Sequence, residues 1–135
     1  LTTDFFAGSA LSLIYSDRSP MEHYHLLTMH RLLSRSECNV LANVPRAQRG
    51  RLREMIVACV LGTDMRNHAS FIEALGALVA APAYSHDATA AARSTLLVGI
   101  TKAADISNVC RPFEVSRKWA VAVEEEWHAQ GELLC

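Results

Sequence analysis

Acidic and imidazole side chains recur on helical stripes of this 135-residue chain that are otherwise apolar. His25, Asp64, Asp105 and Glu126 each lie on or beside such a stripe. A buried charge is unfavourable unless it meets a counter-charge, a hydrogen bond or a metal ion, so each side chain needs a partner. Because four such groups face apolar surface together, the pattern predicts a shared polar site in a helical core.

Each of these side chains also has a simpler interpretation. His25 can be a hydrogen-bonded core histidine, and Asp105 can end a helix and cap the turn into Ser107. Glu126 belongs to the acidic run 124–126, which is typical of a solvated helix face. From the residues alone, both interpretations remain open.

Two further polar features have local explanations. Ser19, Pro20 and Glu22 fit a capping box, in which the serine and the glutamate satisfy the first amides of a helix. Asp64 and His68 lie four residues apart, so they can form a local ion pair if one helix contains both.

Apolar residues recur at three- and four-residue spacings along most of the chain, and this period is typical of amphipathic helices. We expect helices over residues 1–15, 19–35, 45–68 and 71–80, a fifth helix that runs through residues 93–105, and a last helix that begins at Pro112. Pro82 stops the fourth of these, and Asp87 or Thr89 caps the fifth. Since only six glycines and four prolines are present and no hairpin signal appears, the sequence predicts an all-α fold.

The charge balance argues against a polyanionic partner. The net charge is −1, which disfavours nucleic-acid binding. Basic residues do cluster in one expected helix, at Arg46, Arg49, Arg51 and Arg53. We interpret this cluster as a solvated helix face, on which Arg46, Arg49 and Arg53 lie roughly opposite Leu52 and Ile56.

Cysteine spacing and hydropathy favour a cytoplasmic protein. The four cysteines form no C-x-x-C pair and have no nearby histidine at zinc-finger spacing, so we expect reduced thiols at Cys38, Cys59, Cys110 and Cys135. No apolar run reaches the roughly 18 residues that a membrane span needs, and no secretory signal is visible.

Four motifs, taken in order, resemble the catalytic domain of the eukaryotic class I cyclic nucleotide phosphodiesterases. They are LSLIYSDRSPMEHYH, LGTDMRNH, KAADISN and RKWAVAVEEEWHAQG. The corresponding family patterns are L-A-x-x-Y-x-D-x-S-x-L-E-x-H-H, T-D-M-x-x-H, A-D-x-S-N-P and W-x-x-x-x-x-E-E-F-x-x-Q-G. The resemblance runs from Leu1 to Gly131 and implies a multi-helix bundle of the HD type, of which residues 1–135 are a part.

The resemblance implies a metal-dependent hydrolase that converts cAMP or cGMP to the 5′-monophosphate. Two divalent ions, Zn²⁺ with Mg²⁺ or Mn²⁺, would lower the pKa of the attacking water and neutralise the phosphate. The implied partner is a cyclic nucleotide, with no nucleic acid and no membrane span, and a homodimer would form through parts of the full-length protein.

Residue roles follow from the same resemblance. Asp105 corresponds to a metal ligand, and Glu22 and Thr63 to residues that hydrogen-bond waters around the metals, with Asp64 beside them. Two histidines would support this arrangement, His25 and His68. Near the phosphate and base the resemblance implies Met65 and Asn108, and along the apolar wall against the purine it implies Val123 and Trp127.

Three departures from the family patterns bear on the implied site. Tyr24 replaces a histidine, Val109 replaces a proline, and Trp127 replaces a phenylalanine. The family segments H-N-x-x-H and H-D-x-x-H-x-G, and the glutamine that binds the purine, have no counterpart here. We therefore expect an interior segment with one of four protein metal ligands that is inactive alone. The alternative is a catalytically degenerate helical module that binds a nucleotide or a protein partner.

Overall fold

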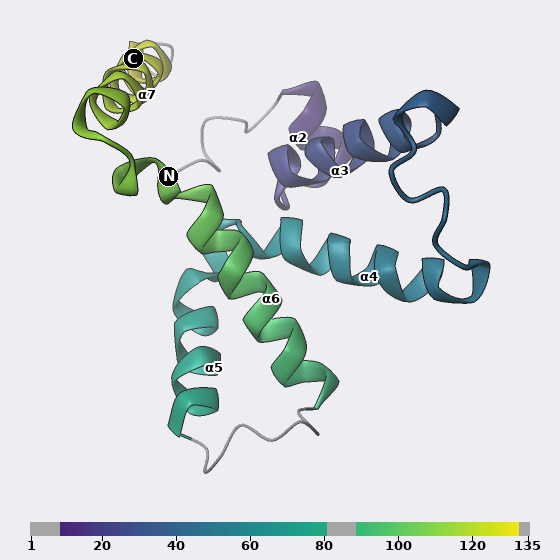
Figure 1. Cartoon of the computed structure of the whole chain (residues 1–135). Coiled ribbons are helices and arrows are strands. Elements are labelled where there is room, and N and C mark those ends of the chain that lie inside the picture. The colour runs from purple at the N-terminus through teal and green to yellow at the C-terminus, as the bar shows by residue number, and fades with distance from the viewer. Residues whose placement is uncertain (1–8, 81–88, 133–135) are drawn as a thin grey trace.

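The computed structural model describes residues 9–80 and 89–132. Every regular element in these ranges is a helix, which confirms the all-α prediction (Figure 1). The α-helices are α2 (Ala10–Ile14), α3 (Pro20–Leu33), α4 (Arg46–Gly62), α5 (His68–Ala80), α6 (Ala90–Asp105) and α7 (Phe113–Glu132). The 3₁₀ turns are η1 (Ser36–Cys38), η2 (Met65–Asn67) and η3 (Ser107–Cys110). None of the described helices is long and apolar enough to cross a membrane.

Two crossing helices, α4 and α6, form the centre of the described structure (Figure 1). Gly62 permits their close approach, because a β-carbon on it would lie 2.5 Å from Val98 Cγ1. Helix α3 packs on α4, α5 packs on α6, and α2 packs on α3. Helix α7 contacts mainly the preceding turn η3 and stands apart from the other helices in Figure 1. The crossing therefore brings the end of α4 against the last two turns of α6.

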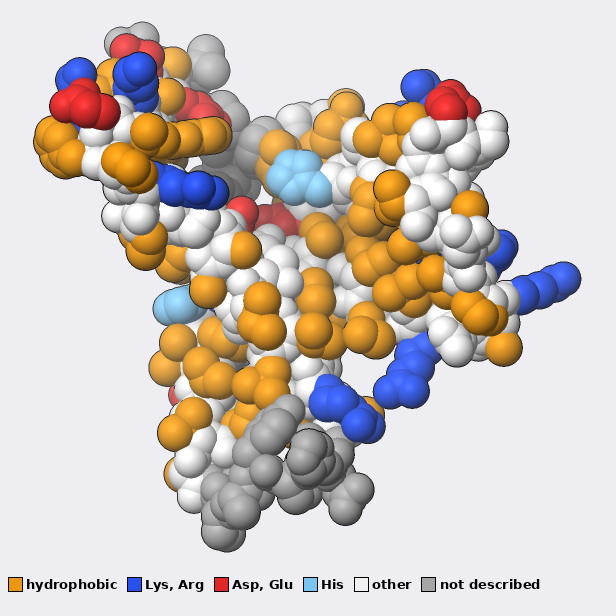
Figure 2. All heavy atoms as spheres, in the orientation of Figure 1, with side chains coloured by type: hydrophobic (Ala, Val, Ile, Leu, Met, Phe, Trp, Pro, Cys, Tyr) orange, Lys and Arg blue, Asp and Glu red, His pale blue; other side chains and the backbone are white. Residues whose placement is uncertain are grey.

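The buried part of the described structure is small and partly polar. Leu26, at 7% exposed, is the one large hydrophobic side chain that is buried among the described residues, whereas Ser12, Asp64 and Lys102 are buried polar residues. Many apolar side chains lie on the surface, and Figure 2 shows them spread over much of one face. Phe113 in α7, for example, is 74% exposed. The helices thus present apolar faces that the described residues do not cover.

The start of α3 confirms the predicted boundary but not the predicted capping box. Ser19 is the N-cap and Pro20 is the first helical residue. Ser19, however, has left-handed backbone angles (φ 45°, ψ 49°), and its side chain makes no capping hydrogen bond. Its hydroxyl bonds to Asp64 instead. Among the described residues, the Glu22 carboxylate has no recorded partner, so the expected exchange of bonds between Ser19 and Glu22 is absent.

The arginine cluster also differs from its prediction. Arg49 and Arg53 line the same shallow depression as Leu52 and Ile56, so they do not lie opposite these apolar residues. The cause is the helical period, which places residues 49, 52, 53 and 56 within one sector of α4. Arg49 moreover has a structural role, because it donates hydrogen bonds to the carbonyls of Val44 and Ala42 at 3.0 and 3.2 Å. The exposure expected of the cluster is confirmed.

The remaining boundaries agree in most places with the prediction. Thr89 caps α6 by accepting a hydrogen bond from the Ala92 amide, as expected for one of the two candidates. The other candidate, Asp87, and Pro82 lie outside the described residues, as do the first eight positions of the expected N-terminal helix. The described cysteines are free thiols, Cys38, Cys59 and Cys110. Cys135 is not described.

Candidate functional site

A sharp turn of residues 63–65 joins α4 to η2 and carries three predicted site residues. The hydroxyl of Thr63 donates to the carbonyl of Val60 at 2.8 Å, and the helix ends there. Asp64 then begins η2, because its Oδ1 accepts a hydrogen bond from the Arg66 amide at 2.9 Å. Since α4 stops at Gly62, Asp64 and His68 do not share one helix, and the local ion pair considered from their spacing does not form.

The loop before α3 is bound to this turn. The Ser19 hydroxyl donates to Asp64 Oδ2 at 2.7 Å, and the Arg66 guanidinium donates to the carbonyl of Asp17 at 2.7 Å. Asp64 is only 5% exposed, and its buried carboxylate is satisfied by the Ser19 hydroxyl and the Arg66 amide. Ser16, Asp17 and Ser19 all have positive φ values, which is an unusual concentration of left-handed backbone at non-glycine residues. Such a conformation persists only where surrounding contacts determine it.

The end of α6 provides the opposite wall. Asp105 is the last residue of α6, as predicted, and its carboxylate is exposed. The side chain does not cap the following turn η3, whose first residues have no side-chain cap. One turn earlier, Lys102 is buried and donates from Nζ to the carbonyl of Gly62 at 2.8 Å. This bond links α6 directly to the residue that precedes Thr63.

A cleft of about 590 Å³ lies between the turn, α5 and α6, and four predicted site residues line it. They are Thr63, Met65, His68 and Asp105. The remaining lining is largely apolar and comes from Phe71, Leu75, Leu96, Gly99, Ile100, Ala103 and Ile106, with Lys102 as the other charged residue. Residues from two sequence motifs about 40 positions apart therefore meet in one concave site.

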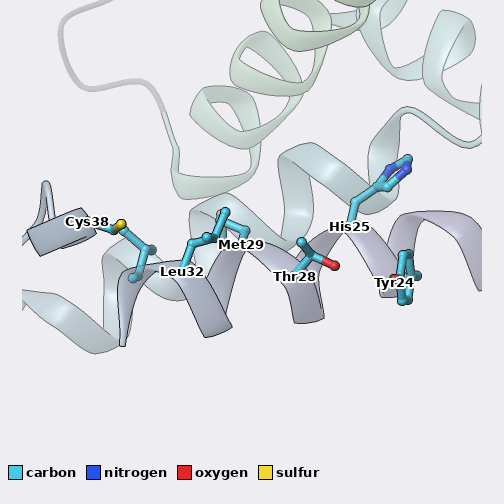
Figure 3. A pocket seen from close by; sticks show the side chains of 7 residues that line it. Tyr24, His25, Thr28, Met29, Leu32 and Cys38 are labelled. Carbon is cyan, nitrogen blue, oxygen red and sulfur yellow. The ribbon is translucent and has the colours of Figure 1, made fainter. Parts of the chain in front are cut away.

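Other predicted residues lie elsewhere. His25 is exposed and, with Tyr24, lines a separate groove of about 510 Å³ along α3. In Figure 3 the side chains of Tyr24 and His25 point to different sides of α3. Glu22 is half-buried in the first turn of the same helix. Of the four polar groups expected to face one core, only Asp64 is buried, whereas His25, Asp105 and Glu126 are exposed. The prediction that all four share one buried polar site is therefore wrong.

The predicted nucleotide-binding residues of the C-terminal part are not in the cleft lining. Asn108 is half-buried in η3, directly after the end of α6. Val123 is half-buried and Trp127 is 66% exposed on α7. Val109, which stands at a proline position of the family pattern, is exposed. The structure thus brings Thr63, Met65, His68 and Asp105 together and leaves α7 apart from them.

A divalent metal ion suits the chemistry of only part of this site. The Asp105 carboxylate opens on the cleft without an ion pair to any described residue, so its oxygens are available to a hard cation. No group of three or more His, Cys, Asp or Glu side chains within residues 9–80 and 89–132 could hold a metal ion by itself. The described residues therefore fit one ligand of a metal site that needs further donors.

Two contacts at the candidate site were not predicted from the sequence. The hydrogen bond between Ser19 and Asp64 joins residues 45 positions apart, and no local sequence pattern predicts such a contact. Lys102 did leave a signal, because it is a lone lysine between Val98 and Ile106 at helical four-residue spacing. A charged residue inside an apolar stripe indicates a specific buried partner, and here that partner is the carbonyl of Gly62.

Comparison with known proteins identifies the family. The sequence model described as 3'5'-cyclic nucleotide phosphodiesterase matches residues 2–134. The chain belongs to the cyclic nucleotide phosphodiesterase family. A solved phosphodiesterase structure, the phosphodiesterase domain of the Salpingoeca rosetta rhodopsin phosphodiesterase, superimposes with a TM-score of 0.85 and 29% identity. That superposition covers 98% of this chain and 41% of the solved one.

Curated phosphodiesterases of both substrate types are similar to the chain. The 3',5'-cyclic-AMP phosphodiesterase, isoform F, of Drosophila melanogaster is 30% identical over 98% of this chain and 21% of its own length. The high affinity cGMP-specific 3',5'-cyclic phosphodiesterase 9A of the same organism is 35% identical over 93% of this chain and 8% of its own length. This phosphodiesterase chain thus spans a minor part of the relatives that it matches.

Proposed function

We propose that the protein containing this chain is a metal-dependent 3′,5′-cyclic nucleotide phosphodiesterase that hydrolyses cAMP, cGMP or both to the 5′-monophosphate. The observation that carries the proposal is the cleft, which collects Thr63, Met65, His68 and Asp105 from two separate motifs. The names of similar proteins support both nucleotides as candidates, since one is named a 3',5'-cyclic-AMP phosphodiesterase and another is named cGMP-specific.

In this proposal Asp105 is a metal ligand, because its carboxylate lies at the cleft and is free of described cationic partners. When bound, the ions (Zn²⁺ with Mg²⁺ or Mn²⁺) would supply an activated water and neutralise the phosphate. Thr63 and Glu22 would orient water molecules near the metals, and the buried Asp64 would hold the turn that carries Thr63. His68, at the cleft, would support this arrangement together with His25.

Substrate binding would use both polar and apolar side chains. Met65, whose side chain is 64% exposed at the cleft, and Asn108 would lie near the phosphate and base. Val123 and Trp127 on α7 would supply apolar surface for the purine, which an exposed tryptophan suits well. The position of α7 would then depend on parts of the protein that bring it over the cleft.

We further propose that residues 1–135 are part of one catalytic domain and that other parts of this domain provide the remaining metal ligands. The exposed apolar faces support this division, because their side chains would be covered by further helices. The coverage of 41% of the solved phosphodiesterase chain is consistent with it. The enzyme would act in the cytoplasm, where it would end cyclic nucleotide signals.

Product analysis of the full-length protein tests the proposed function. Purified protein is incubated with cAMP or cGMP, and the phosphorus NMR spectrum is followed with and without a chelator. We expect a 5′-monophosphate, loss of turnover on chelation, and recovery with Mn²⁺ or Mg²⁺. Binding of either nucleotide without turnover would instead support the degenerate binding module, and 3′-monophosphate as the product would contradict the proposed chemistry.

A further inference from the structure

Lys102 is a buried lysine at the centre of the helix crossing. The chain has two lysines, and Lys102 is 8% exposed whereas Lys118 lies on the surface of α7. Lys102 precedes Asp105 by three residues on α6, so the two side chains lie on neighbouring positions of one helix face. Both residues line the cleft.

Three helices meet at the ammonium group of Lys102. Its Nζ donates to the carbonyl of Gly62 in the last turn of α4, at 2.8 Å. It also lies 5.6 Å from the centre of the Phe71 ring of α5, which is within the range of a cation–π interaction. The carbonyls at a helix C-terminus carry partial negative charge, so this end of α4 attracts a cation.

Fold stability alone does not account for a lysine here. No carboxylate of the described residues forms an ion pair with Lys102, so its charge is desolvated without a counter-ion. Burying an ammonium group in this way is unfavourable, and a methionine of similar length would fill the same space without that penalty. What the lysine adds is a directional bond between α6 and the residue preceding Thr63.

We propose that Lys102 is a positioning residue for the cleft: its bond to Gly62 fixes the end of α6, with Asp105, relative to the turn that carries Thr63 and Met65. This inference rests on the proposed function, in which Asp105 binds a metal ion. A shift of about 1 Å between a metal ligand and its supporting residues lowers turnover by around a hundredfold in enzymes. The bond therefore acts on the reaction through geometry, without contact with the substrate.

The test compares Lys102→Met with Lys118→Met in the full-length protein. Lys102→Met removes the donor and keeps the length, so we expect kcat to fall at least about tenfold with KM changed by less than about threefold. Lys118→Met should leave both constants unchanged, because this lysine is exposed and does not line the cleft. Normal kcat in Lys102→Met would overturn the proposal.

A second variant separates positioning from stability. Lys102→Arg keeps a charged donor, so its melting temperature should stay close to that of wild type, but its larger planar head shifts the turn and should leave kcat about threefold or more below wild type. A purely structural lysine predicts wild-type melting temperature and wild-type kcat in Lys102→Arg, and that result would overturn the proposal even if Lys102→Met failed to fold.

Hydrogen exchange of the peptide covering residues 60–67 provides a readout that does not need activity. We expect faster exchange in Lys102→Met than in Lys118→Met, because the tether at Gly62 is lost. If the wild-type protein hydrolyses no cyclic nucleotide, the proposed function fails while this comparison still tests the tether. Equal exchange in the two variants would overturn the inference irrespective of turnover.

Discussion

The hydroxyl of Ser19 donates a 2.7 Å hydrogen bond to Oδ2 of the buried Asp64, which lies 45 residues further along the chain. The other carboxylate oxygen of Asp64 accepts from the Arg66 amide, and the Arg66 side chain bonds back to the carbonyl of Asp17. Two of the sequence motifs are therefore joined by reciprocal bonds. The left-handed backbone at residues 16, 17 and 19 is consistent with a loop whose shape these contacts determine.

Ser19→Ala should destabilise the protein by about 1–3 kcal/mol, because it leaves a buried carboxylate oxygen without its donor. Ser34→Ala is the matched control, since the Ser34 hydroxyl bonds to the Arg31 carbonyl on the exposed surface. Urea unfolding of the full-length variants measures the difference. Equal midpoints for the two variants would show that the bond to Asp64 contributes no stability.

Gly62→Ala should also destabilise, by roughly 1–3 kcal/mol, because its β-carbon would lie 2.5 Å from Val98 Cγ1. Valine has a stiff χ1, so α4 and α6 must separate to relieve the contact. Gly50→Ala in the same helix is the control: nothing lies within 4 Å of its β-carbon, and alanine there should stabilise by about 0.5–1 kcal/mol. We expect the melting temperature to fall in Gly62→Ala and to rise in Gly50→Ala. A Gly62→Ala variant as stable as wild type would argue against tight packing between α4 and α6.

Arg49→Ala should loosen the segment before α4, because it removes the bonds to the Val44 and Ala42 carbonyls. The effect on global stability should be small, about 0.5–1.5 kcal/mol, since the bonds are exposed. Arg51→Ala is the control, as Arg51 is exposed and has no recorded partner among the described residues. Limited proteolysis measures cleavage within residues 39–45, which should be faster in Arg49→Ala alone.

The presence of the helices was predictable from the sequence, because the spacing of apolar residues reflects the 3.6-residue period of an α-helix. The start of α3 at Pro20 and the cap at Thr89 were also predictable, since both depend on local sequence signals. Asp105 was likewise recognisable by its place in a motif, although its role as a metal ligand remains a prediction. The end of α4 at Gly62 was missed, because apolar spacing continues through Thr63 while Asp64 starts a new turn.

Contacts between distant segments were not predictable, since they depend on how the helices pack. Ser19 has the residue type of an N-cap, and nothing local indicates that its hydroxyl turns to Asp64 instead. Burial was not predictable for the same reason: His25 lies on an apolar stripe in the sequence, yet its side chain is exposed. A stripe reports which face can be buried, and the partner that buries it is not in the local pattern.

The 135-residue chain produced alone should neither bind the metal pair nor hydrolyse cAMP, because its described residues offer no cluster of three metal ligands. It should also self-associate, since large apolar side chains such as Phe113 and Trp127 are exposed. Light scattering and metal analysis check both expectations. A monomer with a cooperative melt, or chelator-sensitive hydrolysis, would contradict this description of the chain.

The most direct test of the account is the rate of cyclic nucleotide hydrolysis by the full-length protein carrying Asp105→Ala. Because Asp105 is proposed as a metal ligand at the cleft, we expect turnover at least about a hundredfold below wild type and a lower bound-metal content. Glu73→Ala, which removes an exposed carboxylate from α5, should leave both unchanged. Wild-type turnover and metal content in Asp105→Ala would contradict the central claim that this carboxylate holds the catalytic metal.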